Sequence, residues 1–162
     1  MRWSAPLILI LLAAAASLLP GVPAPAAAAQ LNLNVNPASI TFPDLNPDLS
    51  PSVPSTPATV RVRIRVRMNG GQPWQLTLAA NDHLRSGADV ITVDNVTWTT
   101  TPAAPPWTAG GTLALAPGQM VASGTGNVNP PETADLAFRL ANRWTYAVGT
   151  YTTTATFTLS AP

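Results

Sequence analysis

The stretch from Val60 to Met68 reads V-R-V-R-I-R-V-R-M, so apolar and arginine side chains alternate strictly over nine residues. Only a β-strand has a repeat of two residues, with successive side chains on opposite faces. One face of this strand is therefore aliphatic, and the other carries Arg61, Arg63, Arg65 and Arg67. Such a strand is typical of an antiparallel sheet that covers a core on one side and meets water on the other.

Further segments alternate in the same way, and none has the period of a helix. They lie at residues 31–35, 40–42, 74–78, 90–93, 96–99, 113–115, 136–140 and 151–159. Loops rich in proline and glycine separate them. This pattern predicts an all-β fold, namely an antiparallel β-sandwich of immunoglobulin-like type with seven to nine strands.

Two connections carry predictions of their own. Asn69-Gly70-Gly71 is a turn sequence, so we expect the strand at 60–68 and the strand at 74–78 to form a hairpin. Residues 43–57 contain five prolines, which lack the backbone N–H that a sheet needs. We expect this segment to run over the surface and to cross from one sheet to the other.

The first 29 residues have the features of a secretory signal peptide. Arg2 precedes an apolar run from Ala5 to Leu19, and Ala27 and Ala29 form an A-x-A cleavage motif before Gln30. An uncleaved membrane anchor is the alternative, but the apolar run is short for a membrane span. We therefore expect one domain at residues 30–162, secreted to the cell surface, with no membrane span in the mature form.

The charge balance limits the partners of the mature domain. The chain contains eight Lys and Arg residues, all of them arginine, and seven acids, so loss of Arg2 leaves a neutral domain. A neutral domain lacks the long-range field that attracts nucleic acid, and any anion binding must come from local clusters. There is no cysteine, so no disulfide contributes to stability.

The residues needed for catalysis are missing from the sequence. His83 stands alone, without a cysteine or a G-x-S-x-G motif to serve, and one histidine cannot form a zinc site. Asp82, Asp89 and Asp94 flank one polar loop, but they lack the dense spacing of a calcium loop and are read as solvated acids. We expect no enzyme, no cofactor and no metal.

Tryptophans are the natural anchors of a sandwich core. Trp74, Trp98, Trp107 and Trp144 are large rings, and burial is the first expectation for all of them. Trp107 lies between a proline-rich and a glycine-rich stretch, so an exposed loop aromatic that stacks on a sugar ring is the alternative for this residue.

Two segments resemble the WxL domain family of bacterial cell-surface proteins. Trp74-Gln75-Leu76 is similar to the first Trp-x-Leu motif, and Phe157-Thr158-Leu159 stands where the family has its second. In the second segment phenylalanine keeps the apolar bulk and lacks the indole donor. The resemblance implies that Trp74, Leu76, Phe157 and Leu159 supply one core, in a non-catalytic domain held on the cell wall.

Weaker similarity extends to modules of pilin and spore-coat type, in I-T-V-D-N-V-T-W and in the V-G-T-Y before the last strand. This likeness implies assembly with other surface proteins.

The arginine row has two readings. It is either a solvated sheet face, matched by cross-strand acids and hydroxyls, or a ladder of planar donors for carboxylates or phosphates of a wall polymer. The leading hypothesis is a non-enzymatic surface domain that binds cell-wall polymer or partner surface proteins. The alternative is a structural subunit of a pilus-like or coat assembly, a homo-oligomer or filament in which a sheet edge accepts a neighbour's strand.

Overall fold

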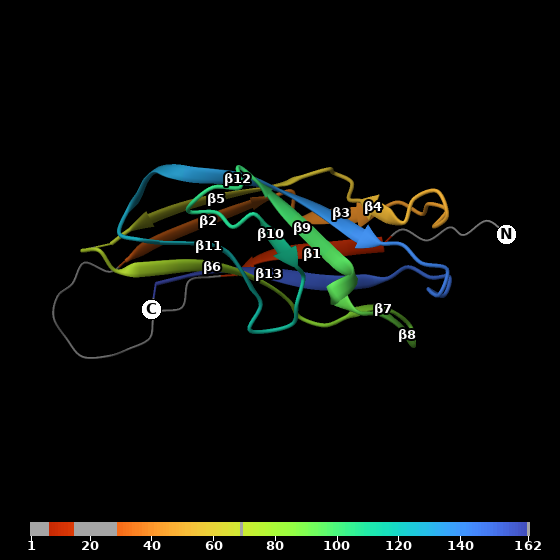
Figure 1. Ribbon diagram of the computed structural model, residues 1–162. Coiled ribbons are helices and arrows are strands. Elements are labelled where there is room, and N and C mark those ends of the chain that lie inside the picture. Colours follow the sequence, from red (N-terminus) through yellow and green to blue (C-terminus); the bar gives the residue numbers. More distant parts are fainter. Residues whose placement is uncertain (1–6, 15–28, 69, 162) are drawn as a thin grey trace.

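The alternating segments form two sheets packed face to face, as the computed structural model shows for residues 7–14, 29–68 and 70–161 (Figure 1). The first sheet has the order β11-β6-β13-β1-β3, with β7 and β8 attached to β13. The second has the order β10-β9-β12-β5-β2, with β4 on β12. The predicted all-β sandwich is confirmed.

The strands of the first sheet are β1 (Leu7–Ala14), β3 (Ser39–Phe42), β6 (Pro73–Ala80), β7 (Leu84–Ser86), β8 (Asp89–Ile91), β11 (Gln119–Thr125) and β13 (Thr152–Ser160). Those of the second are β2 (Gln30–Asn36), β4 (Ser52–Pro54), β5 (Val60–Arg67), β9 (Val96–Thr101), β10 (Gly110–Thr112) and β12 (Val128–Ala141). One 3₁₀ turn, η1 (Val93–Asn95), precedes β9. Every strand pair in the described chain is antiparallel except β1 with β13.

The described chain has thirteen strands, more than the seven to nine expected. Three of the strands without a predicted counterpart, β4, β7 and β10, have only three residues each, which is too short to show a repeat of two. The other two are β11, which has no strict alternation, and β1, which the sequence assigns to the leader. The strand expected at 113–115 is wrong, because Leu115 makes only an isolated bridge to Ala80. Ala27 of the expected cleavage motif lies outside the described residues, and cleavage stays a prediction.

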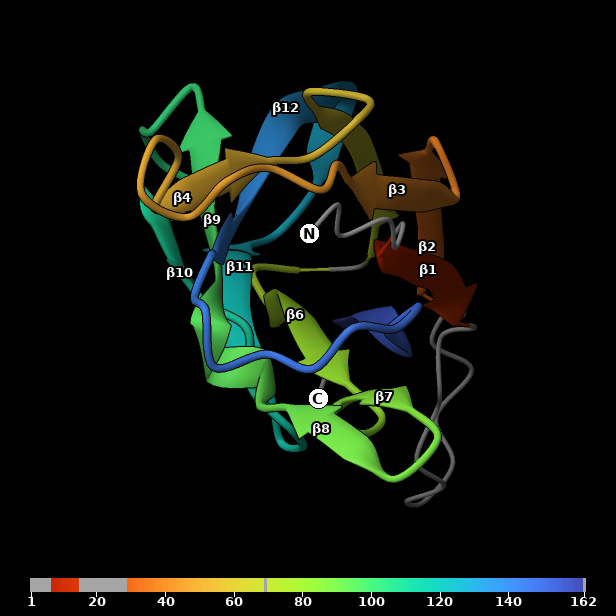
Figure 2. The same cartoon turned by 90° about the vertical axis from the view of Figure 1, so that its right-hand side faces the viewer.

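The core lies between the sheets and follows the predicted alternation. On β5, Val60, Val62, Ile64 and Val66 are fully buried while the arginines face outward. The last strand shows the same pattern, with alternate residues from Tyr151 to Leu159 buried and the threonine row at 152, 154, 156 and 158 on the outer face. Figure 2 shows the two layers end-on. The buried side chains of both sheets form one core cluster between these layers.

The predicted hairpin between β5 and β6 is wrong. Both edges of β5 are paired, one with β12 and the other with β2, and β6 lies in the opposite sheet between β11 and β13. Gly70 and Gly71 therefore belong to a crossing between sheets, and Asn69 lies outside the described residues. The crossing is held beside the β11–β12 turn, because Gly126 N–H donates to the Gln72 carbonyl over 2.8 Å.

The proline-rich segment at 43–57 does cross between sheets, as predicted. It leads from β3 in the first sheet to β5 in the second, and Thr41 and Thr56 exchange backbone hydrogen bonds of 2.8 and 2.7 Å. The expectation that the whole segment is a surface connection without a strand is wrong, because Ser52–Pro54 form the short strand β4, which pairs with the end of β12 and buries Val53. None of the described residues form a helix with the length and apolar character to cross a membrane.

Two buried tryptophans pack against glycines of neighbouring strands. Trp74 on β6 is in register with Gly124 on β11, and Trp98 on β9 is in register with Gly111 on β10. A Cβ at Gly124 would stand 2.7 Å from Cζ2 of the Trp74 ring, and one at Gly111 would stand 3.1 Å from Cζ2 of Trp98. The indole rings therefore occupy the space that a side chain would take.

Ile64 is the middle of the buried face of β5 and has an exposed fraction of 0%. We expect Ile64→Ala to lower the free energy of unfolding by about 2–5 kcal/mol, because the cavity adds to the lost apolar burial. Arg67→Ala, on the outer face of the same strand, is the matched control and should change stability by less than about 0.5 kcal/mol. A loss below about 1 kcal/mol for Ile64→Ala in urea unfolding would contradict the buried face.

The two glycines offer a graded test of the packing. Gly124→Ala should destabilise the domain by about 1–3 kcal/mol, since the methyl group overlaps the Trp74 ring. Gly111→Ala should cost less, because a shift of a few tenths of an ångström relieves its contact. Thermal melts of the two variants measure the difference, and equal losses of stability would contradict the tighter packing of Trp74 against Gly124.

Candidate functional site

The outer face of β5 carries the predicted row of arginines. Arg61, Arg63 and Arg67 are exposed and Arg65 is half-buried, while the residues between them point into the core. Alternate residues of a strand lie about 6.6 Å apart. The row is therefore a line of four guanidinium groups along one side of the molecule.

A row of side-chain amides lies beside it on β2. Gln30, Asn32, Asn34 and Asn36 are all exposed, and each is directly opposite one arginine. The register pairs are Gln30 with Arg67, Asn32 with Arg65, Asn34 with Arg63 and Asn36 with Arg61. These eight residues are called the arginine–amide face below.

The other neighbour of β5 is β12, which neutralises one end of the row. Asp135 accepts hydrogen bonds from Nε and Nη2 of Arg61 over 2.9 and 3.2 Å. This hydrogen bond and the carboxylate charge raise the pKa of Arg61. Next along the row, Thr133 stands opposite Arg63 and brings a hydroxyl rather than a charge.

The other three arginines have no ion pair in the described part of the chain. Neighbouring guanidinium groups at this spacing repel each other by about 0.6 kcal/mol per pair in water, before screening by salt. Arg65 is half-buried, and its Nε is shielded from solvent and lacks a hydrogen-bond partner among the described residues. The face therefore holds unmatched positive charge and donor capacity.

Trp107 is buried, so its expected alternative as an exposed loop aromatic is wrong. Its exposed fraction is 4%, and an isolated bridge to Ala122 draws its backbone against β11. The adjacent Thr108 donates its backbone N–H to the Val121 carbonyl over 2.9 Å. The loop is thus tied to the sheet, and the ring faces the core.

Among the described tryptophans, Trp144 is the exposed one, contrary to its expected role as a core anchor. It has an exposed fraction of 52%, and its indole N–H donates to Oδ1 of Asp48 over 2.9 Å. The amide of Asn142 donates to the carbonyls of Leu45 and Ser50, so two loops are joined at this point. The alternation of β12 does not continue through 142–149, so no repeat in the sequence assigns this ring to an inner or an outer face.

The motif-like residues lie where the resemblance implies. Trp74, Leu76, Phe157 and Leu159 are all buried in the one core cluster. They stand on the adjacent antiparallel strands β6 and β13, with Leu159 directly opposite Leu76. Phe157 is fully buried. Unlike tryptophan, its ring has no N–H group that would need a hydrogen-bond partner in the core.

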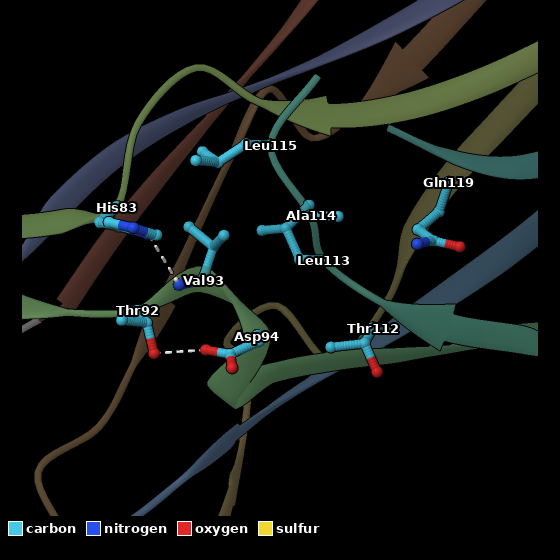
Figure 3. Close-up of a pocket in the computed structure, with 9 residues that line it drawn as sticks. All are labelled: His83, Thr92, Val93, Asp94, Thr112, Leu113, Ala114, Leu115 and Gln119. Atoms are coloured by element: carbon cyan, nitrogen blue, oxygen red, sulfur yellow. Dashed lines mark hydrogen bonds between the residues drawn. The ribbon is translucent and has the colours of Figure 1, made fainter. Parts of the chain in front are cut away.

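A pocket of about 510 Å³ lies elsewhere, at the β7–η1 end of the sandwich (Figure 3). His83 uses Nδ1 to accept the backbone N–H of Val93 over 3.4 Å, and Asp94 accepts the hydroxyl hydrogen bond of Thr92. The remaining walls are largely apolar, from Val93, Leu113 and Leu115. Both titratable groups thus hold the η1 turn in place.

The loop acids are engaged in the same local way. Asp82 accepts a hydrogen bond from Nε of Arg85 over 2.7 Å and another from the backbone N–H of His83. These hydrogen bonds lower the pKa of Asp82. Across the described ranges no three His, Cys, Asp or Glu side chains are grouped to hold a metal ion.

No protein-family model matches the chain, and no curated protein matches it significantly. The resemblance to WxL domains therefore stays a prediction, and the geometry of the arginine–amide face carries the functional argument.

The contrast between the two loop tryptophans is open to a fluorescence test. We expect Trp144→Phe to remove most of the tryptophan emission that acrylamide quenches, because this ring is half exposed. Trp107→Phe should leave the quenchable fraction unchanged, since that ring is buried. If Trp107→Phe instead removed most of the quenchable emission, this would contradict the burial of Trp107 and the exposure of Trp144.

Proposed function

We propose that this protein is a secreted, non-enzymatic cell-surface domain that binds an anionic polymer of the cell wall through the arginine–amide face. The single observation that carries the proposal is the register of β2 against β5, which sets four amides opposite four arginines on one exposed face. Within the described sheets, Asp135 is the one carboxylate paired with this row.

The chemistry of the face suits a polymer that combines charge with hydroxyl groups. Guanidinium groups bind carboxylate or phosphate through two parallel hydrogen bonds, and unpaired ones are available at Arg63, Arg65 and Arg67. Side-chain amides supply both donors and acceptors, as sugar hydroxyls require. The positive charges repeat about every 6–7 Å, which is the spacing of alternate residues along β5. This repeat favours an extended ligand over a small ion.

Because the mature domain is predicted to be neutral, attraction must be local. The Debye length is about 8 Å at physiological salt, so only ligand charges close to the four guanidinium groups contribute. Binding is therefore expected to weaken with salt and to depend on this face alone.

The test replaces two arginines in the middle of the row. Arg63→Gln with Arg65→Gln should weaken binding to immobilised poly(glycerol phosphate) and polygalacturonate about 10- to 100-fold, because charge-assisted hydrogen bonds are lost. Folding should survive, as both side chains lie on the outer face. Binding isotherms across a salt series, with thermal melts alongside, provide the measurement.

Two control proteins make the result specific. Arg85→Gln with Arg143→Gln removes the same charge away from the face and should bind like the parent, since the exposed Arg85–Asp82 pair adds little stability. Lysine at 63 and 65 should restore binding only in part, because it keeps the charge and loses the planar fork. If the glutamine pair binds both polymers as well as the parent, the row is a solvated sheet face.

A further inference from the structure

The strand β1 occupies an unusual place in the first sheet. It lies between β13 and β3, in parallel register with β13 from Ile8–Thr152 to Ala14–Thr158 and in antiparallel register with β3 from Leu7–Phe42 to Ile10–Ser39. Figure 2 shows β1 directly beside β3. Among the described strands, β3 joins the first sheet through β1 alone.

The two flanking strands present core residues to this position. Ile40 and Phe42 of β3, and Ala155 and Phe157 of β13, are fully buried or nearly so. Register places residue 9 opposite Ile40 and residues 11 and 13 opposite Ala155 and Phe157. An occupant of this slot must therefore be extended and apolar at alternate positions, or the core opens to water.

The sequence predicts that Leu7–Ala14 leaves with the leader, which would empty the slot. Loss of β1 would expose the backbone hydrogen-bonding groups of β13 along one edge and would detach β3 from its sheet. An unpaired edge beside a buried apolar surface is the arrangement that accepts an added strand.

We propose that the slot between β13 and β3 is a strand-acceptor site, which takes an extended apolar segment of another protein once the leader is removed. The segment has at least seven residues with apolar side chains at every second position, and it runs parallel to β13. The Leu7–Ala14 strand seated there serves as its template.

A second copy of this chain is a poorer donor. Its long alternating strands β5, β6 and β12 are each paired on two sides, and β13 is held by β6 and forms one wall of the slot itself. The edge strand β2 packs Leu31, Leu33 and Val35 against its own core. Donation by any of them would take a strand out of a formed sheet. A partner with an unpaired apolar segment has no such cost.

The experiment begins with the full chain expressed in a secreting host. Intact-mass measurement of the secreted product reports whether residues 7–14 are gone. A fluorescein-labelled peptide with the Leu7–Ala14 sequence between lysine flanks is then titrated into this product, and polarisation and melting temperature are measured. We expect saturable binding and a higher melting temperature, because a ligand of the folded state stabilises it.

Two peptide variants test the register. Leu9→Asp with Leu11→Asp puts carboxylates opposite Ile40 and Ala155, and it should weaken binding by about 100-fold or more. Ile8→Asp with Ile10→Asp puts the same charges opposite Thr152 and Thr154 on the outer face, and binding should stay within about fivefold of the parent peptide.

The proposal is overturned if the secreted protein retains residues 7–14. It is also overturned if the folded secreted protein does not bind the peptide, or if the secreted protein forms polymers without a partner. If the secreted domain is isolated unfolded, peptide present during refolding must restore a cooperative melt, and failure there also overturns it. Arg63→Gln with Arg65→Gln should bind the peptide like the parent, so this test and the polymer test fail independently.

Discussion

The two-residue repeat of β5 is the constraint on which the rest of the structure depends. A slip of one residue in its pairing would send four arginines into the core and four aliphatic side chains into water. Burial of even one unpaired guanidinium costs several kcal/mol, which is a large share of the total stability of a domain this size. The registers of β2 and β12 are therefore constrained by β5, and with them the amides and the carboxylate that lie beside the arginine row.

This gives the arginine row a role in folding as well as a proposed role in binding. Any exposed charged residue would specify the register, so folding explains why the row is polar but not why it is arginine throughout. Lysine is absent from the whole chain, so arginine also stands at the cationic positions outside the row. The binding proposal therefore rests on the arrangement of four planar forks on one face, which suits bidentate contact with carboxylate or phosphate.

Local periodicity was enough to predict strands, their inner faces and the sandwich, because a period of two is a property of each segment alone. The partners of the strands were not predictable in this way. Gly70 and Gly71 are compatible with a hairpin, but β5 already has β2 and β12 on its edges, and the chain must cross to the other sheet. The turn sequence describes only the local backbone.

The same difference applies to the candidate site, where features within one strand could be predicted and contacts between strands could not. The arginines were visible because they alternate within one strand, whereas the amides opposite them come from a separate strand whose register is decided by the whole core. Burial of the loop tryptophans depends equally on distant contacts: Trp107 is drawn in by β11, and Trp144 is held at the surface by Asp48. Neither loop has a repeat from which this could be read.

The arginine–amide face and the proposed strand-acceptor slot belong to different sheets, but they are connected through a very short piece of chain. Only Pro37 and Ala38 separate β2, which carries the amides, from β3, which lines the slot. A strand that fills the proposed slot would hold β3 in place, and it would thereby restrain the end of β2 where Asn36 is opposite Arg61. Ordering the amide row in this way would lower the entropy cost of the proposed polymer binding. Since such coupling is reciprocal, polymer bound on the outer face of the second sheet would also favour the filled slot in the first.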